Sequence, residues 1–369
     1  MKNRMRKLVA LLAVSTMTLS MLAACGGNKE AAAPAAAEPA QATEEAAPAE
    51  EAAPVEETAE ATTDDNTLPR NETLYFAGQQ WGAVNSWNPI GTNQNNSMAI
   101  AGNASGYRTL MFETLYMFNF MDGTMQPLLA DGDYSWNDDM TELTVKIKSA
   151  AKWSDGTPVT ANDVAATYAI GLEIGNGTGT GNQAYIDTIE AADDATVVIK
   201  SKLTDDGKPV NPLKLLDFLT GTPIAQAAWI DTVKTRCNGD ATAILNDPGE
   251  DVVWSGPYTK YFADDQKVVL VRDDNYWGQD ASMWGSLPVP KYIAHTIYAD
   301  NAAGEAALKA GEVDVCQQFI GNVQDLWEKD GLAISTYYED APYGVCLTMP
   351  TAWYNMNIEV IKENPALRK

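Results

Sequence analysis

The sequence predicts a mixed α/β fold for the part of the chain that follows about residue 69. Short stretches in this part alternate apolar and polar residues, as half-buried strands do. Segments with helix-start and helix-stop signals lie between these stretches. The stretches expected to form strands are 74–76, 143–147, 196–200, 268–272 and 292–298.

A tight turn and a helix are expected to follow the strand at 143–147. The pair Asp155-Gly156 supplies the positive φ that a tight turn requires. Thr160 and Asp163 have the spacing of a capping box. A helix should therefore begin near Ala161.

One face of this helix is expected to be buried. Val164, Tyr168 and Leu172 follow one another at intervals of four residues. Side chains at that spacing lie on the same side of a helix. They predict that a core covers this side.

A second helix is expected at 302–310. Asp300 or Asn301 is a suitable N-cap residue for it, and Gly311 is a stop signal directly after it. These local patterns alone describe ordinary α/β units and name no function.

Three longer motifs add a resemblance to a known family. They are KWSDGTPVTANDV at 152–164, SGPYTKYFADDQKVVLVRDDNYWG at 255–278 and ALKAGEVDV at 307–315. In the same order, they resemble hallmarks of the family 5 extracellular solute-binding proteins. These are the receptors of peptide, nickel and oligosaccharide ABC importers.

The resemblance implies a bilobal α/β receptor similar to the type II periplasmic binding proteins. Residues 69–342 are expected to form a first lobe, with an inserted subdomain at about 113–221. Residues 343–369 are expected to start a second lobe that is mostly missing, because family members continue where this chain stops. Such receptors close two lobes around a ligand, so residues 66–369 alone are expected to bind more weakly than a longer chain.

Aromatic residues suggest where a ligand binds. Among ten tryptophans, Trp81 and Trp87 lie in a polar loop after the strand at 74–76. An indole face stacks on a sugar ring or a peptide side chain, although both residues fit equally well as caps of the sheet. Trp153 and Trp277 belong to the motifs and are expected to pack in the core.

Further binding residues are carried over by resemblance. The segments LYFAGQQWGAVNSWNPIGTNQ and YYEDAPYGVCL look more like the cello- and xylo-oligosaccharide-binding branch than like the oligopeptide-binding branch. The peptide receptors usually have Leu-Asp-Pro where this chain has Trp87-Asn88-Pro89. The candidates implied at the cleft are Trp87, Asn88, Trp254, Ser255, Gln317, Gln318 and Tyr343.

The first 24 residues have the pattern of a lipoprotein signal peptide. A basic start with Lys2, Arg4, Arg6 and Lys7 precedes an apolar run at 8–22. The run is shorter than the roughly 20 residues of a membrane-spanning helix. Small residues then precede Cys25, which is expected to carry lipid after cleavage and to anchor the protein outside the cytoplasm.

Residues 25–68 are expected to form a disordered tether behind the lipidated cysteine. They are rich in Ala, Glu, Pro and Thr and contain no aromatic residue. Such a composition buries too little apolar surface to fold.

Charge and cysteine content exclude several classes of partner. The net charge of −25 disfavours nucleic acid and anionic lipid surfaces. After Cys25, the cysteines Cys237, Cys316 and Cys346 have no metal-site spacing. They are expected to be buried small residues, and the pairing of any disulfide among them stays open.

Nothing in the sequence indicates catalysis or a cofactor. The single histidine, His295, lies in the expected strand at 292–298 and is expected to be a packed or edge residue. The glycine-rich run 175–181 follows a helix and lacks the Lys-Ser/Thr ending of a phosphate-binding loop, so a flexible loop is expected. Acidic residues are numerous, but no carboxylate pair is marked as that of a glycosidase.

These observations predict a tethered solute-binding lipoprotein with no enzymatic activity. It is expected to act as a monomer, to capture oligopeptides or short oligosaccharides and to deliver them to an ABC permease. The alternatives are a surface-tethered glycan hydrolase and an adhesin, neither of which accounts for the three ordered motifs.

Overall fold

The computed structural model describes residues 68–78, 83–91, 110–119, 122–317, 320–321, 323–336 and 363. The chain divides into two compact units, Met1–Asp64 and Asp65–Lys369, and all described residues belong to the second. The predicted signal peptide, Cys25 and all but the end of the predicted tether lie outside the described residues. The same holds for Trp81, Gln318 and Tyr343, and for the predicted start of a second lobe apart from residue 363.

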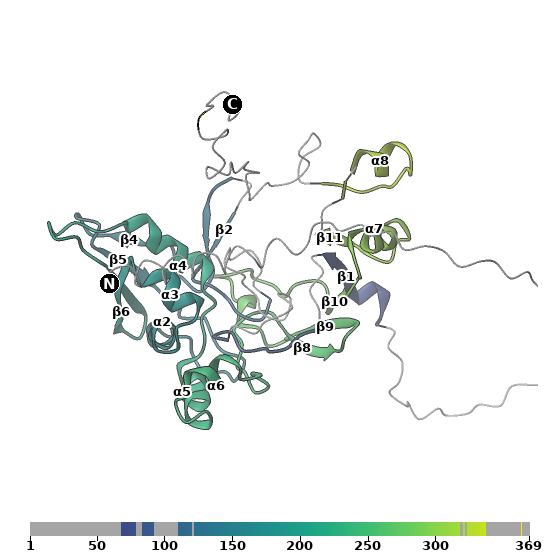
Figure 1. Ribbon diagram of the computed structural model, residues 1–369. Coiled ribbons are helices and arrows are strands. Elements are labelled where there is room, and N and C mark those ends of the chain that lie inside the picture. The colour runs from purple at the N-terminus through teal and green to yellow at the C-terminus, as the bar shows by residue number, and fades with distance from the viewer. Residues whose placement is uncertain are drawn as a thin grey trace, which may run out of the picture. The chain divides into compact units, whose positions relative to one another are not determined.

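A mixed five-stranded sheet contains strands from both halves of the described chain (Figure 1). Its order is β11-β1-β10-β9-β8, in which β1 pairs in parallel with β10 and with β11, while the β10–β9 and β9–β8 pairs are antiparallel. Its strands are β1 (Thr73–Gly78), β8 (Tyr258–Ala263), β9 (Lys267–Arg272), β10 (Tyr292–Thr296) and β11 (Val315–Gln317).

A second, antiparallel sheet is formed by the middle of the chain. It has the order β4-β5-β7-β6, and a separate ribbon pairs β2 with β3. The strands are β2 (Tyr116–Phe118), β3 (Met125–Pro127), β4 (Ser135–Trp136), β5 (Glu142–Lys146), β6 (Ile186–Asp193) and β7 (Thr196–Ser201). The predicted division into a first lobe and an inserted subdomain at 113–221 stays a prediction.

Short helices connect and cover the sheets. The α-helices are α2 (Ala161–Ile174), α3 (Gly177–Asn182), α4 (Leu215–Gly221), α5 (Ala227–Arg236), α6 (Ala241–Leu245), α7 (Asn301–Lys309) and α8 (Val323–Glu328). Three single-turn 3₁₀ segments are η1 (Arg70–Glu72), η2 (Pro212–Lys214) and η3 (Trp277–Gln279).

The local signals placed these elements well. Each of the five predicted strands coincides with a strand of the structure, namely β1, β5, β7, β9 or β10. Helix α2 begins at Ala161, and the carboxylate of Asp163 accepts a hydrogen bond of 2.8 Å from the backbone N–H of Thr160. At the start of α7, Asp300 is the N-cap and accepts from the backbone N–H of Ala303 at 2.8 Å.

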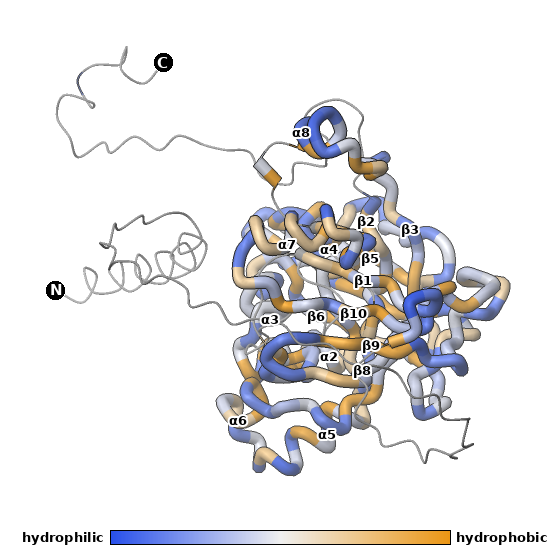
Figure 2. The backbone as a smooth tube through the Cα atoms, turned by 90° about the vertical axis from the view of Figure 1, so that its right-hand side faces the viewer, coloured by the Kyte–Doolittle hydropathy of each residue, from blue (hydrophilic) through white to orange (hydrophobic). Residues whose placement is uncertain are grey.

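Helix α2 contributes to two hydrophobic cores. Val164 and Tyr168 pack in the core of the four-stranded sheet, which also buries Trp153 and Trp277. Ile170 and Ile174 pack in the core on the inner face of the five-stranded sheet. Figure 2 shows the hydrophobic character of β9, a strand that contributes to this second core.

The expectation that Leu172 is buried was wrong. Its side chain is 42% exposed. Residues four apart drift by about 40° around a helix, and two such steps carry Leu172 away from the side of Val164. The second core instead takes Ile170 and Ile174.

The expectation that 175–181 forms a flexible loop was also wrong. Gly175 ends α2 in the left-handed conformation, and α3 follows, with the Asn176 side chain accepting a hydrogen bond of 3.0 Å from the backbone N–H of Gly179. A Cβ atom on Gly179 would lie 2.1 Å from the carbonyl oxygen of Gly171. The glycines therefore allow α3 to pack directly on the backbone of α2.

This contact makes a matched pair of substitutions informative. Gly179→Ala is expected to destabilise the protein by about 1–3 kcal/mol, because the new methyl group must push two backbones apart. Gly181→Ala in the same helix meets nothing within 4 Å and is expected to be neutral or stabilising by up to about 1 kcal/mol. Denaturant unfolding measures both, and equal effects would contradict the close packing.

Candidate ligand-binding site

The carboxyl ends of two parallel strands meet at one edge of the five-stranded sheet. In the register of β1 and β11, Ala77 lies opposite Cys316 and Gly78 opposite Gln317. Open α/β sheets bind ligands just outside the carboxyl ends of their strands. In the sequence, Trp81 comes three residues after Gly78 and Gln318 comes directly after Gln317; both lie outside the described residues.

An ion pair and a small core hold this edge together. The carboxylate of Asp314 accepts a hydrogen bond of 2.8 Å from the backbone N–H of Tyr75 and pairs with the guanidinium of Arg70. Burial raises the pKa of Asp314, but the hydrogen bond and charge of Arg70 outweigh it, and the net shift is downward. Beneath the strands, Ala77 packs with Ala307 of α7 and with Val313. The third motif thus joins β11 to β1.

Trp87 and Asn88 occupy buried positions in the fold. Asn88 has no exposed surface, and its side chain accepts from the backbone N–H of Ile90 and donates to the carbonyl of Ile244, both at 2.9 Å. Trp87 is 6% exposed, and the ammonium of Lys260 lies 5.8 Å from the centre of its ring. A ligand contact by either residue stays a prediction.

A charged cluster holds the loop against which Trp87 and Asn88 pack. The guanidinium of Arg236 forms two hydrogen bonds of 2.6 Å with Asp247 and a third of 2.6 Å with Asp251. Burial raises the pKa of Asp247, yet the hydrogen bonds from Arg236 and from the backbone N–H of Gly249 lower it below its usual range. The carbonyl of Pro248 then accepts from the backbone N–H of Trp87 at 2.8 Å.

Trp254 and Ser255 lie at a second position, beside Glu113. The Ser255 hydroxyl is buried and accepts from the backbone N–H of Glu113 at 3.0 Å. The indole N–H of Trp254, whose side chain is partly buried, donates to Asp273 at 3.2 Å. Gln317 contributes its backbone to the β1–β11 edge. The structure therefore brings Gln317 to the strand edge and places Trp87, Asn88, Trp254 and Ser255 elsewhere in the fold.

Glu113 was missed by the sequence analysis. It is 1% exposed, and burial raises the pKa of its carboxyl to about 8. The sequence does contain an indication that Glu113 is unusual, because it is the one charged residue in the otherwise uncharged segment Leu110–Asn119. An ionisable group in such a segment is buried and needs partners.

His295 is placed as expected, whereas the two described cysteines are not. His295 is 2% exposed, and its ring packs 5.4 Å from that of Phe76, which confirms a packed residue. Cys237 and Cys316 are only partly buried, so full burial was wrong for these two. Cys346 lies outside the described residues.

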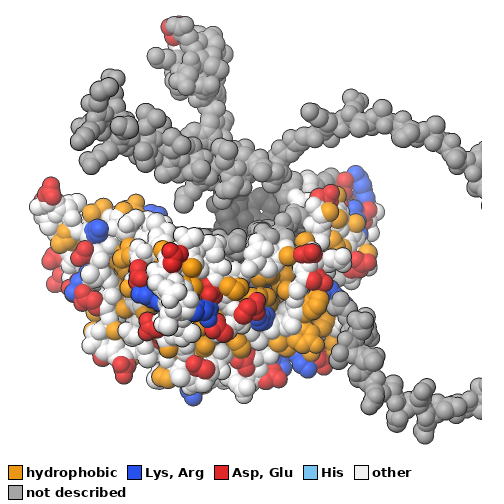
Figure 3. Space-filling model, turned by 60° about the horizontal axis from the view of Figure 1, so that its bottom comes forward, with side chains coloured by type: hydrophobic (Ala, Val, Ile, Leu, Met, Phe, Trp, Pro, Cys, Tyr) orange, Lys and Arg blue, Asp and Glu red, His pale blue; other side chains and the backbone are white. Residues whose placement is uncertain are grey.

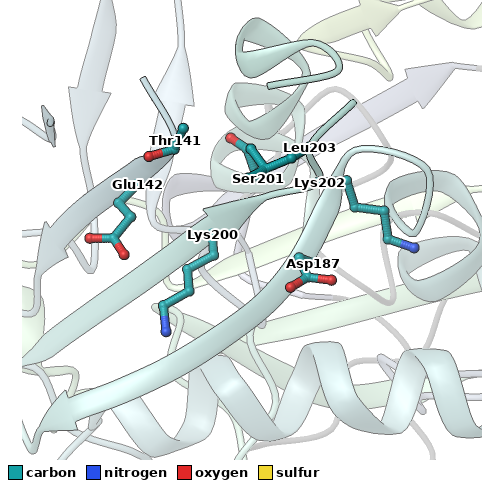
Figure 4. Close-up of a pocket in the computed structure, with 7 residues that line it drawn as sticks. All are labelled: Thr141, Glu142, Asp187, Lys200, Ser201, Lys202 and Leu203. Atoms are coloured by element: carbon teal, nitrogen blue, oxygen red, sulfur yellow. The ribbon is translucent and has the colours of Figure 1, made fainter. Parts of the chain in front are cut away.

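Other surfaces of the described chain give weaker indications of a ligand-binding site. Figure 3 shows acidic side chains scattered over one face with basic ones among them, so charge marks no single site there. A depression of about 420 Å³ at the four-stranded sheet is lined by Glu142, Asp187, Lys200 and neighbouring residues. In Figure 4, Lys202 extends away from Glu142 and Lys200, so these polar groups do not converge.

The described residues contain neither a cluster of metal ligands nor a membrane-spanning helix. Within the described ranges, no group of three or more His, Cys, Asp or Glu residues is arranged to hold a metal ion. None of the helices described there has the length and apolar character needed to cross a membrane.

Comparisons with known proteins identify relatives of the chain. The model of the bacterial extracellular solute-binding proteins, family 5 (middle part), matches residues 124–369. A probable peptide-binding protein, YejA, of Agrobacterium fabrum is 29% identical over 192 residues, which cover 52% of this chain and 30% of that protein. The peptidoglycan-binding protein YepA of the same bacterium is 27% identical over 213 residues, which cover 57% of this chain and 32% of that protein. The matches span about a third of the length of these relatives.

A solved structure extends the similarity to three dimensions. The periplasmic oligopeptide-binding protein of an ABC transporter from Thermotoga maritima, crystallised with mannohexaose, is 26% identical with a TM-score of 0.61. The superposition covers 75% of this chain and 47% of that one.

Proposed function

Because the chain belongs to the bacterial extracellular solute-binding proteins, family 5, we propose that it is the substrate-binding receptor of an ABC importer. Its sheets and helices form part of a type II periplasmic-binding-protein fold. In this function it captures a short oligomer outside the cytoplasm and hands it to a membrane permease. It acts as a monomer and catalyses no reaction itself.

The observation that carries this proposal is the edge where β1 and β11 end together. The register pairs Gly78 with Gln317 at the carboxyl ends of the two strands, which are followed in the sequence by the segments that begin at residues 79 and 318. That is the position at which open α/β folds bind small molecules. Trp81, Gln317, Gln318 and Tyr343 are the proposed ligand contacts from these segments and from the chain after them, with Trp254 as a further candidate.

The ligand is proposed to be an oligopeptide or a short oligosaccharide. The similarity to a probable peptide-binding protein supports the first, and the similarity to a protein crystallised with mannohexaose supports the second. Indole rings and amide groups suit both, since a ring face stacks on apolar surfaces while amides both donate and accept hydrogen bonds.

Calorimetric titration of the protein with oligopeptides and with cello-, xylo- and manno-oligosaccharides tests this function. One class is expected to give saturable binding, and mass spectrometry is expected to recover that ligand intact. Cleaved products would identify a hydrolase. Binding to insoluble polymer alone would identify an adhesin, and either result would overturn the proposal.

The location of the protein is proposed to depend on Cys25. Cleavage before this residue and lipidation of its sulfur would hold the receptor at the outer side of the cell membrane. Cys25→Ser is expected to abolish labelling by a fatty-acid analogue and to move the protein from the membrane fraction to the soluble extracytoplasmic fraction. Unchanged labelling and fractionation would show that Cys25 is not the anchor.

A further inference from the structure

Glu113 is a buried carboxyl group outside the set of proposed ligand contacts. It lies in a segment that connects parts of the fold. The carbonyl of Leu110 accepts from the backbone N–H of Tyr258 at the start of β8 at 2.9 Å, and the carbonyl of Leu115 accepts from Leu128 at 3.0 Å. The side chain of Glu113 therefore sits where the chain passes from the five-stranded sheet toward the β2–β3 ribbon.

Two aromatic donors close over this carboxyl from the turn at 276–278. The Tyr276 hydroxyl bonds to Oε1 of Glu113, and the Trp277 indole N–H bonds to Oε2 at 2.9 Å. The same indole N–H reaches the carbonyl of Ser255 at 2.9 Å. The second motif thus contacts segment 110–116 through this acidic side chain as well as through the backbone hydrogen bond between Tyr258 and Leu110.

The charges that face Glu113 are few. Lys148 is the cation that acts on it. This residue is 5% exposed, and its ammonium already donates to the carbonyls of Leu128, at 2.7 Å, and Ala130. Asp131 in turn acts on Lys148. The Tyr276 hydroxyl is the other titratable group in contact with Glu113, and its own pKa is raised by burial and by that carboxyl.

Burial dominates this balance. It raises the pKa of Glu113 from 4.5 to about 8, against the opposing hydrogen bonds of Tyr276 and Trp277 and the charge of Lys148. At neutral pH the carboxyl therefore holds its proton. The Tyr276 hydroxyl and the Trp277 indole N–H remain its two hydrogen-bond donors.

We propose that Glu113 is a proton-operated latch between segment 110–116 and the turn at 276–278. The neutral carboxyl closes the seam between them. As the pH rises toward the value at which the folded protein releases this proton, the free energy of unfolding falls, because the carboxyl is already ionised in the unfolded chain but not in the closed seam. The latch thus couples the stability of the contact between segment 110–116 and the turn at 276–278 to the external pH, in a protein that is proposed to work outside the cytoplasm.

The sign of the effect follows from proton linkage. Between the ordinary value of 4.5 and about 8, the folded state holds the proton that the unfolded state has lost. The stability that Glu113 contributes is thus full below this window and declines as the pH rises through it. Above the window the decline stops.

Denaturant unfolding of the protein and of Glu113→Gln at a series of pH values tests the latch. The glutamine side chain has nearly the shape of the neutral acid and keeps an oxygen that accepts hydrogen bonds, but it does not titrate. The unfolding constant of the unmodified protein, relative to this variant, is expected to rise by up to about tenfold per pH unit within the window and then to level off. A ratio independent of pH would overturn the proposal.

Two further variants make the test specific. Glu142→Gln removes an exposed glutamate of β5 and is expected to leave the pH dependence unchanged. Tyr276→Phe removes a donor that lowers the pKa of Glu113, so the levelling-off is expected to move to higher pH. This second shift tests the latch even if Glu113→Gln does not fold, and a curve that stays in place would contradict it.

Discussion

Replacing Asp163 by alanine is expected to destabilise the protein by about 3–5 kcal/mol. The carboxylate is 5% exposed and accepts from the backbone N–H groups of Thr160 and Ala227, each at 2.8 Å. It also accepts from the Trp153 indole at 3.3 Å. Its loss leaves these buried donors without a partner, and each such donor costs about 1–3 kcal/mol. The effect is large because one side chain joins the turn, the start of α2 and the start of α5.

Denaturant unfolding measures this effect against two controls. Asp163→Asn keeps one acceptor oxygen and is expected to lose less stability than the alanine variant. Asp231→Ala changes an exposed aspartate of α5 and is expected to fall within about 0.5 kcal/mol of the unmodified protein. If Asp163→Ala cost no more than Asp231→Ala, the connecting role of this carboxylate would be refuted.

Gly249→Ala is expected to cost about 2–4 kcal/mol, because it combines backbone strain with a collision. Gly249 has a φ of 64°, and a Cβ there would lie 2.6 Å from the backbone nitrogen of Asn88. The collision pushes on the segment that carries Trp87 and Asn88. Both the stability of the protein and the position of this segment should therefore change.

Gly239→Ala separates the two causes. Gly239 has a similar φ of 72°, but a Cβ there meets nothing within 4 Å, so this variant is expected to show the strain alone. Thermal or denaturant unfolding compares the two, and amide hydrogen exchange at 86–90 reports on the position of the segment. Equal losses of stability with unchanged exchange would show that Gly249 does not press on Asn88.

The features predicted best from the sequence are those that depend on residues close together in the chain. The start of α2 at Ala161 depends on Thr160 and Asp163, which are three residues apart, and the start of α7 depends on Asp300. Such signals act within one turn of chain and can be read without knowing the fold. The strand positions were predictable for the same reason.

Contacts between distant residues could not be predicted in this way. Tyr276 meets Glu113 across 163 positions of sequence, and Ala227 meets Asp163 across 64. The sequence predicted a loop at 175–181, where the structure has helix α3. This helix packs on α2 through the close approach of Gly179 to Gly171, and local sequence patterns do not reveal such a contact. Leu172 is exposed because the core changes sides along α2.

The residues of the candidate site lie in two different settings. Family resemblance singled out Asn88 and Ser255, whose buried hydrogen bonds to the backbone appear only once the fold is known. By contrast, Gln317 reaches the β1–β11 edge because strand pairing places it there. Strand direction and register therefore carry more information about the site than residue type does.

The central claim is that ligand binds at the edge where β1 and β11 end together. The most direct measurement is amide hydrogen exchange of the protein with and without the oligopeptide or oligosaccharide that binds it in calorimetry. We predict slowed exchange at 74–91 and 313–321, with exchange in β6 and β7 unchanged. Protection confined to β6, β7 and the depression beside Lys200 would contradict the account.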